Sequence, residues 1–497
     1  MKNTVKSLIF VSLCQAPCVA LELIDEYSGE NDELTSDSTW WQDLQERELA
    51  GASINELSDR VLLRMATTDD AVCDVQSTGV AGAHVISIRR GYFNQMVVDG
   101  SSRAVNQALA RQLQPQQGRI IRKSELSSML AWLHRNPFHA VAPTFTPGTA
   151  DGAVDSLWHV EPLRRWRATI GANNQGIAPL SRERFLLEAM LGDLAGHNSV
   201  MSLQWVTAAD PNEFSSLRWD NTMYLPWRHE WRTSFSWTGT SFLDDCSCVI
   251  PQLVEGETWQ ASTKYVIPSE NRFGWSSEKH VAIYYRSTNN ALEAGDTTNS
   301  GVVDSIFLGM GWNWLKKRAR SESRVSCEFL VSPGGIGGNN DQADHEVYRI
   351  GAENNYVMLR TSLQHVQALQ GNWRWAGYAT SQISSAPVLP HDQMALGGMQ
   401  GVRALPENAL LGDQVIRYGT ELRSETWKVK TVPCELAVSA YLDGGYARDM
   451  EEHSQQTAHS LGFGLHLVSA NQLRIDLSQA WEFRGENMFY GSMRWSF

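Results

Sequence analysis

The segment with the most unusual residue spacing is the glycine-rich run from Met394 to Ala404, in which Gly397 and Gly398 relax the usual backbone limits. Runs of this kind cradle phosphate groups in some nucleotide-binding loops. That chemistry also needs a Lys followed by Ser or Thr and a helix that opens directly afterwards, and the segment has neither. The run by itself therefore predicts a flexible surface loop, whose glycines need no function.

Other residues that could do chemistry are few. Cys246 and Cys248 lie close together in a polar segment, where they could form a disulfide or have no role, and both interpretations stay open. No His and no second Cys pair stands at ligand spacing, so we expect no metal site. The sequence shows no paired carboxylates and no nucleophile elbow, so we expect no enzyme activity and no cofactor.

Length and charge narrow the class of protein. The chain has 497 residues, too many for one ordinary soluble domain, and a formal net charge of −13, which argues against a nucleic-acid partner. No run of about twenty apolar residues follows the N-terminus, so we expect no membrane-spanning helix. The 19 Trp residues are many, and Trp favours membrane interfaces.

The N-terminus has the features of an export signal. Lys2 and Lys6 are followed by an apolar stretch from Leu8 to Leu13, and Ala20 ends a small-residue cleavage site. We expect residues 1–20 to be a signal peptide. Residues 21–51 are strongly acidic, and such a block repels itself, which predicts a flexible linker or a marginal helix.

Two small α/β units are predicted after the acidic block. The first, residues 52–100, is short and carries two strands, 84–88 and 95–98, with a turn at Gly91.

The second unit, residues 101–160, has the order helix, helix, strand, strand. Its helices are predicted over residues 105–113 and 126–133, and its strands over residues 140–146 and 154–160.

The last residues of the chain alternate strictly between apolar and polar types. The apolar face consists of Phe489, Gly491, Met493, Trp495 and Phe497, and the polar face of the residues between them. A strand between lipid and a wet lumen has this pattern. We predict that it is the final strand of a barrel and that Trp495 and Phe497 serve as the assembly signal of the C-terminus.

Similar alternation recurs from residue 161 to residue 497, which predicts an antiparallel transmembrane β-barrel and a mainly β fold class. Amphipathic strands also build soluble sandwiches, but here some strands are long and end in Trp. An open sheet edge cannot be satisfied in lipid, so the strands must close on themselves. About 330 residues at roughly twenty per strand and loop give roughly sixteen strands. Polar residues 240–256 and 289–303 are predicted as long loops.

One connection, residues 384–413, carries a set of motifs that resembles a known family. The sequence is similar to the two-partner secretion transporters of the outer membrane, the TpsB or hemolysin secretion/activation proteins, in which periplasmic POTRA domains precede a barrel. The matching elements are Gln382, Pro387, Leu389, Asp392-Gln393, Leu396-Gly397-Gly398, Val402-Arg403, Gly412-Asp413, Tyr418-Gly419 and Tyr441-Leu442-Asp443-Gly444-Gly445. The chain departs from the family in having Ala404-Leu405 where the family has Gly-Tyr or Gly-Phe.

The resemblance implies roles for several residues. In the family the long loop folds back into the barrel, and its Arg meets an Asp on the inner wall. Carried over, Arg403 next to Val402 pairs with Asp443, which lies in the strand motif from Tyr441 to Gly445. Such a pair gains charge-assisted hydrogen bonds, and loss of one partner leaves the other unpaired.

The resemblance also implies a function and a location. It implies a pore in the outer membrane of a Gram-negative bacterium, with POTRA-like units in the periplasm, that secretes, or secretes and activates, one large partner protein of the TpsA type. Outer-membrane lipid and the barrel-assembly machinery are further expected partners, whereas nucleic acid is not. Two alternatives remain, a membrane-protein insertase of the same superfamily and, from another class, a diffusion porin or adhesin.

Overall fold

The computed structural model divides the chain into two compact units, residues 1–163 and residues 164–497. The described residues are 20–25, 42–43, 47, 53, 56–61, 73–80, 83–194, 198–244, 252–272, 275–294, 297–428, 434–470 and 472–497. Most of the expected signal peptide and acidic linker, and the pair Cys246 and Cys248, lie outside this set. Residues Ala20–Asp25 form the strand β1, which begins at the last residue of the expected signal peptide and continues into the expected linker.

The first unit contains two three-stranded sheets. In one, β1 lies parallel to β3 (Ala83–Arg90), and β2 (Cys73–Val80) lies antiparallel to β3 on its other side. The other sheet has the order β4-β6-β5, and its strands are Tyr92–Asp99, Ala153–Pro162 and His139–Pro147 in that order.

The strand expected at residues 95–98 belongs to the second sheet and not to the first. It forms β4, which runs parallel to β6, and the helices α4 (Arg103–Leu113) and α5 (Lys123–Leu133) connect β4 to the rest of that sheet. Parallel strands need a long crossover, and two helices supply one. The predicted boundary between residues 100 and 101 therefore falls within this sheet, because it separates β4 from its partner strand β6.

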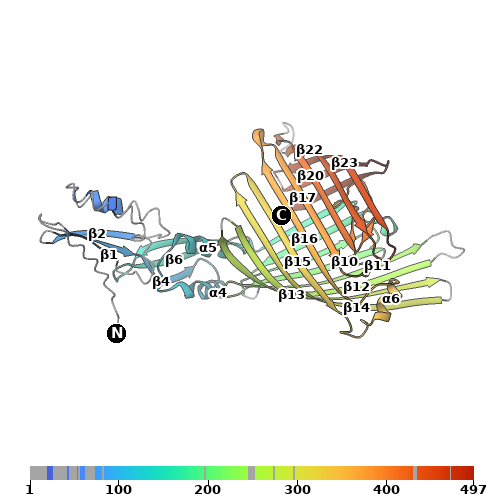
Figure 1. Cartoon of the computed structure of the whole chain (residues 1–497), viewed down its shortest axis with the longest axis horizontal. Helices are drawn as coiled ribbons and strands as arrows, with labels where there is room; N and C mark the ends of the chain where they lie inside the picture. The colour runs from blue at the N-terminus through green and yellow to red at the C-terminus, as the bar shows by residue number, and fades with distance from the viewer. Residues whose placement is uncertain are drawn as a thin grey trace. The chain divides into compact units, whose positions relative to one another are not determined.

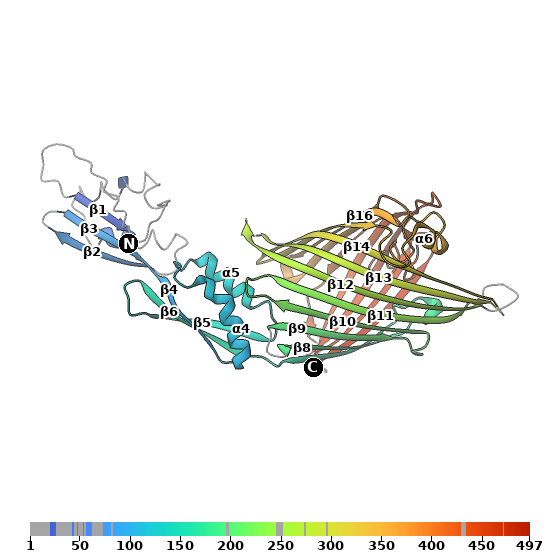
Figure 2. The ribbon, with the colours of Figure 1, turned by 90° about the horizontal axis from the view of Figure 1, so that it is seen from below.

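Among the described residues, the second unit is a closed antiparallel barrel of sixteen strands when β20 and β21 are counted as one strand (Figures 1 and 2). The predicted fold class is therefore confirmed. Its strands are β7 (Trp166–Asn173), β8 (Arg184–Gly192), β9 (Ser199–Thr207), β10 (Phe214–Tyr224), β11 (Glu230–Asp244), β12 (Gln252–Arg272), β13 (Trp275–Ala294), β14 (Thr297–Arg318), β15 (Ser321–Pro333), β16 (Asn355–Ala368), β17 (Arg374–Ser384), β20 (Gln414–Arg423), β21 (Trp427–Lys428), β22 (Cys434–Arg448), β23 (Gln455–Ser469), β24 (Leu473–Glu482) and β25 (Asn487–Ser496).

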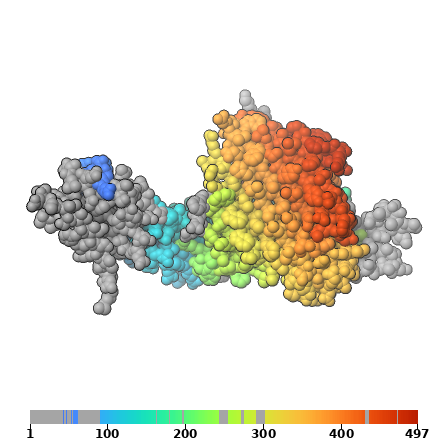
Figure 3. All heavy atoms as spheres, in the orientation of Figure 1, coloured from blue at the N-terminus to red at the C-terminus, as the bar shows by residue number. Residues whose placement is uncertain are grey.

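Alternation along the strands separates an apolar outside from a polar inside. On β23, Leu461, Phe463 and Leu465 are exposed on the outer face, whereas Ser460 between β22 and β24 is fully buried on the inner face. In the space-filling view the residues coloured from yellow to red form one continuous outer surface (Figure 3). Exposed apolar side chains over a whole wall suit a lipid environment. Among the described residues, no helix combines the length and the apolar character that crossing a membrane requires.

Two segments predicted as long loops are largely strand. The β13–β14 ladder continues as far as the pair Ala294 and Thr297, and β11 and β12 pair up to Asp244 and Gln252. Polar residues such as Asn289 and Asn290 keep their ladder partners there. Alternation is lost where both faces of a hairpin stand in water, so the sequence pattern did not reveal these strands.

The barrel closes between its first and last strands. Five residue pairs join β25 to β7, and Phe497 and Ala168 then exchange two backbone hydrogen bonds of 3.0 Å each. The Phe497 ring packs edge-on against Trp495, with 5.1 Å between the ring centroids. The terminal residue thus extends a short seam.

Deleting Phe497 should therefore lower the yield of folded barrel. The loss of two backbone hydrogen bonds at the seam costs about 1–3 kcal/mol. Heat-modifiable mobility on semi-native gels of outer-membrane fractions measures the folded share. Phe489→Ala, which changes an exposed aromatic residue on the same face of β25, is the control and should leave the yield close to that of the wild type. Equal yields from the deletion variant and the wild type would contradict the role of the terminus.

Candidate functional site

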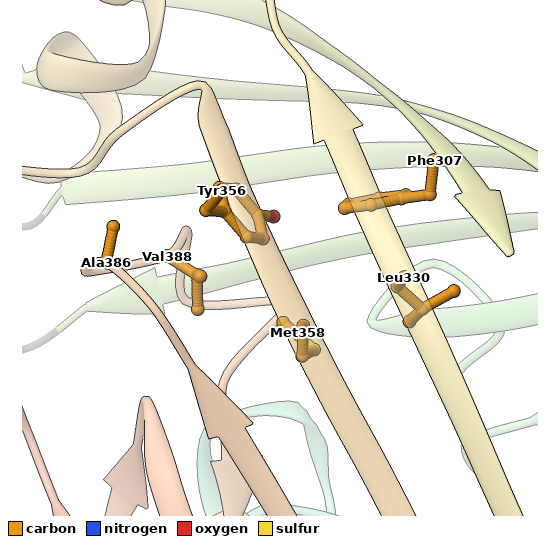
Figure 4. Close-up of a cluster of buried hydrophobic side chains, with 6 residues drawn as sticks. All are labelled: Phe307, Leu330, Tyr356, Met358, Ala386 and Val388. Atoms are coloured by element: carbon orange, nitrogen blue, oxygen red, sulfur yellow. The ribbon is translucent and has the colours of Figure 1, made fainter.

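The connection between β17 and β20, residues 385–413, folds into the lumen and is called the inward loop below. Its two short strands, β18 (Met394–Ala395) and β19 (Leu411–Gly412), pair with each other. Near its start, Ala386 and Val388 face the inner wall, where they join a buried apolar cluster (Figure 4). The other members of this cluster are Phe307 on β14, Leu330 on β15, and Tyr356 and Met358 on β16.

The tip of the inward loop carries the predicted ion pair. Arg403 Nε lies 2.8 Å from Asp443 Oδ2, and Arg403 Nη2 lies 2.9 Å from Asp443 Oδ1. The guanidinium thus makes a forked contact with a carboxylate on β22 that is buried to 4% exposure. Burial alone lowers the pKa of Arg403, but its bonds to Asp443 outweigh burial and raise that pKa above its usual value.

Further groups complete this contact. Arg403 Nη1 lies 3.1 Å from Glu421 on β20, and its guanidinium carbon lies 3.3 Å from the centroid of the Tyr441 ring. Two wall hydroxyls, of Tyr378 at 3.1 Å and of Ser460 at 3.3 Å, also donate to the Asp443 carboxylate. Every oxygen of the buried carboxylate therefore has more than one donor, which offsets its loss of water.

The glycines near the tip allow the turn that presents Arg403. Gly397 forms a bridge with Val402, whose amide donates to Leu396 O at 2.8 Å. Gly398 has a φ of +99°, a backbone region that side chains with a Cβ rarely adopt. Val402 is fully buried in an apolar cluster with Leu396 and residues of β20, β22 and β23.

The departure from the family motif leaves the tip fully packed. Ala404 is completely buried against Tyr441 and Ala480 of the wall. The Leu405 carbonyl accepts a hydrogen bond of 2.9 Å from Tyr490 of β25. The small side chain and a backbone contact therefore hold this part of the loop.

The middle of the inward loop has an anchor that sequence reasoning missed. Asp392 is buried and accepts hydrogen bonds from Arg286 of β13 and, at 3.1 Å, from Tyr356 of β16. Its carbonyl accepts from Gln382 of β17 at 2.8 Å. Burial raises the pKa of Asp392, but the neighbouring Arg286, His391, Arg360 and Tyr356 together outweigh burial and lower that pKa below its usual value. Asp392 and Gln382 belong to the family motif described above, whereas nothing in the sequence indicates that Arg286 lies beside them.

The remaining predicted residues lie where they can support the loop or the wall. Tyr441 stacks on Arg403, and its hydroxyl lies 2.5 Å from Ser478 of β24. A side chain at Gly445 would collide with Leu396 of the inward loop, because a Cβ there would lie 2.4 Å from its Cδ1. Trp495 and Phe497 are on the outer face, far from this contact in register. Among the described residues, no group of His, Cys, Asp or Glu could hold a metal ion.

The described residues form a closed antiparallel barrel that holds one of its own loops against its inner wall, and a separate unit of small sheets. This is the fold of an outer-membrane β-barrel. Residues 283–467 match the family of haemolysin secretion/activation proteins ShlB/FhaC/HecB. The family resemblance predicted from the sequence is confirmed by this match, as is the predicted location in the outer membrane.

Solved structures with a similar fold include two transporters. CdiB from Escherichia coli has a TM-score of 0.78 and 13% identity, with 97% of this chain and 91% of that chain covered. CdiB from Acinetobacter baumannii has a TM-score of 0.69 and 14% identity, with 100% of this chain and 94% of that chain covered. BamA from Haemophilus ducreyi lacking POTRA domains 1-3 has a TM-score of 0.56 and 12% identity, with 96% and 99% covered. These identities support the fold alone. No curated protein sequence matches the chain.

Removing one member of the tip contact should loosen the inward loop. Arg403→Ala leaves the Asp443 carboxylate in a buried position with only its wall donors, at a cost of about 3 kcal/mol. This value is at the lower end of the usual cost of breaking a buried ion pair, because Tyr378 and Ser460 still donate hydrogen bonds to the carboxylate. When Arg403→Ala is already present, Asp443→Asn should lower the free energy of unfolding much less than it does in the wild type. A double-mutant cycle of denaturant midpoints measures this difference.

Arg423→Ala serves as the control for this cycle. Arg423 also pairs with Glu421, at 2.9 Å, but it makes no contact with the inward loop that would be lost. Additive effects of Arg403→Ala and Asp443→Asn would show that the two side chains are not coupled.

Proposed function

We propose that this chain is an outer-membrane pore that secretes one large partner protein by two-partner secretion. The partner is a secreted protein of the TpsA type, which the first unit receives in the periplasm and the barrel passes in an extended form. The observation that carries the proposal is a closed barrel whose lumen is occupied by a loop attached through the family motif. A loop held by polar contacts can be shifted, whereas a solid core cannot.

The wall opposite the inward loop suits an extended polypeptide. The hydrogen bonds of the loop run to β13, β16, β17, β20, β22 and β25. The inner faces of β10 to β12 carry hydroxyl groups that bond one another, such as Ser216 with Thr238 at 2.9 Å and Ser234 with Ser262 at 2.7 Å. A cavity of about 320 Å³ lies along this wall. Small hydroxyl groups can donate and accept hydrogen bonds, as water does, so they suit a polypeptide of any sequence that moves along the wall.

The charges around this cavity are compensated in pairs. Arg218 lies 2.8 Å from Asp220, and Lys264 lies 3.6 Å from Glu328. Paired charges weaken the net field along the wall. A partner segment of either sign could therefore pass without being trapped. The chain has no nucleotide motif, so net movement would come from folding of the partner outside the cell, which prevents its return.

A second candidate, insertion of membrane proteins, is favoured by the seam of the barrel. The β25–β7 pairing has five residue pairs, whereas the neighbouring β7–β8 pairing has eight. An apolar groove of about 710 Å³ crosses the outer face at this seam, beside Ile170, Met493 and Trp495. Depletion of an insertase lowers the abundance of many outer-membrane proteins, whereas depletion of a secretion pore removes one protein from the medium.

Assembly of the barrel belongs to the same proposal. The barrel-assembly machinery would recognise the outward-facing aromatic residues Trp495, in β25, and Phe497, directly after it, before the barrel enters outer-membrane lipid. The two α/β sheets would take up the partner by strand addition at an exposed edge.

The tip contact should matter for export and not only for folding. In cells that produce this chain together with a large secreted protein encoded beside it, Arg403→Ala should reduce the amount of that protein in the medium severalfold. Asp443→Ala should do the same, and both variants should still give a heat-modifiable barrel. Arg423→Ala is the matched control, and normal secretion from all three variants would remove the role of the loop.

The path along the hydroxyl wall can be mapped with neighbouring residues of β12. Gln260 faces the lumen cavity, whereas Trp259 is exposed on the outer face. A photo-crosslinking amino acid at Gln260 should capture the partner during export, because an extended chain would pass within reach. The same amino acid at Trp259 should capture none. Equal capture at both positions, or capture at Trp259 alone, would contradict the path.

A further inference from the structure

Asp413, at the end of the inward loop, is a buried carboxylate whose two oxygens both accept several hydrogen bonds. It is fully buried, and its oxygens accept from the amides of Val388 and Met450 at 2.9 and 2.8 Å. Val388 lies at the start of the inward loop, so Asp413 joins the two ends of that loop. Met450 belongs to the hairpin loop 449–454 between β22 and β23.

Arg349 connects the same carboxylate to a third loop. It lies in the hairpin loop 334–354 between β15 and β16, and its two terminal nitrogens donate to Asp413 at 2.8 and 3.1 Å. Its Nη2 also lies 2.7 Å from Asp449, and its Nη1 donates to the Val388 carbonyl. Gln393 closes the set, because its amide donates to Asp449 at 3.1 Å. One guanidinium therefore bridges three loops.

The loop that carries Arg349 is itself held firmly. Its helix α6 (Gln342–Tyr348) begins with a capping box between Asp341 and Asp344. The Arg349 carbonyl accepts from the amide of Ala352 at 3.0 Å, and the Glu353 amide donates to Pro387 of the inward loop at 3.0 Å. The side chain of Arg349 is thus presented from a fixed backbone.

The three loops leave the barrel at the same end. Strands in a closed antiparallel barrel alternate in direction, and β15, β17 and β22 all end opposite the end where β7 begins. We infer that Arg349, Asp413 and Asp449 form a clasp that ties these loops together and holds this mouth of the barrel closed at rest. The inference goes beyond the proposed function, because it assigns positioning residues for the closed state and needs no partner protein.

The clasp is physically separate from the tip contact. Arg403 binds Asp443 on the inner wall, whereas Asp413 binds residues of neighbouring loops. The tip can therefore leave the wall while both ends of the inward loop stay attached. An Arg is needed in the clasp because its planar fork reaches two carboxylates and a carbonyl at once, which the single ammonium of a Lys does not.

The test is the ion current through purified full-length protein in planar bilayers with potassium chloride and no partner protein. Arg349→Met removes the bridging charge and keeps most of the side-chain length, so the open fraction should rise by about tenfold or more, as expected when a buried ion pair loses one member. Arg349→Lys should give an intermediate rise. Arg324→Met is the control, since Arg324 pairs with Glu322 at 2.7 Å on an exposed part of the same barrel.

A second variant guards against a failure of Arg349→Met to fold, which heat-modifiable mobility reports. Asp449→Asn keeps the Arg349–Asp413 contact and should give a smaller rise. The double variant Arg349→Met/Asp449→Asn should leak no more than Arg349→Met alone, because both changes remove the same contact. Wild-type current from Arg349→Met, an equal rise from Arg324→Met, or additive leaks in the double variant would overturn the clasp. Because the bilayer holds no partner, failure of the export proposal would leave these currents unchanged.

Discussion

Backbone hydrogen bonding in hydrocarbon is the constraint on which the rest of this structure depends. Lipid offers no partner to an unpaired amide or carbonyl, so a sheet that spans the membrane must close on itself. Here closure means that residues 169–173 meet residues 492–496, at opposite ends of the barrel sequence. The register of that seam fixes which residues of β25 face outwards. The strict alternation up to Phe497 is therefore a direct consequence of closure.

Closing sixteen strands creates a lumen too wide for wall side chains alone to fill, and the inward loop occupies part of it. Large apolar side chains on the lumen face, such as Phe307, Leu330 and Met358, cluster where the loop covers them. The loop excludes water there, so these residues gain from burial. On β10 to β12 the same face carries hydroxyl groups that bond one another. The wall thus has one half that holds a loop and one half suited to water or to a polypeptide.

The sequence predicts the barrel well, because alternation is a direct record of two different environments on the two faces of a strand. The pairing of Arg403 with Asp443 follows from the motif and is present in the structure, while its part in export stays a prediction. The sequence does not predict that Arg286 lies beside Asp392 or that Arg349 lies beside Asp413. Each pair joins segments far apart in sequence, and only the fold decides which hairpin loops meet. The β4–β6 pairing was missed for the same reason, since nothing local marks a parallel partner.

The two buried carboxylates of the inward loop system differ in what remains when the loop moves. Asp443 sits on the wall and keeps the hydroxyls of Tyr378 and Ser460 if Arg403 withdraws, and the lumen can supply water. Release of the tip therefore leaves a carboxylate that is still partly satisfied. Asp413 takes its donors from loop segments at Val388, Arg349 and Met450, so moving those loops strips it of its partners together. An unpaired buried charge costs much free energy, so releasing the tip of the loop should cost less than releasing its ends at Asp413. These contacts are consistent with the proposal that the tip of the inward loop moves while its two ends stay attached.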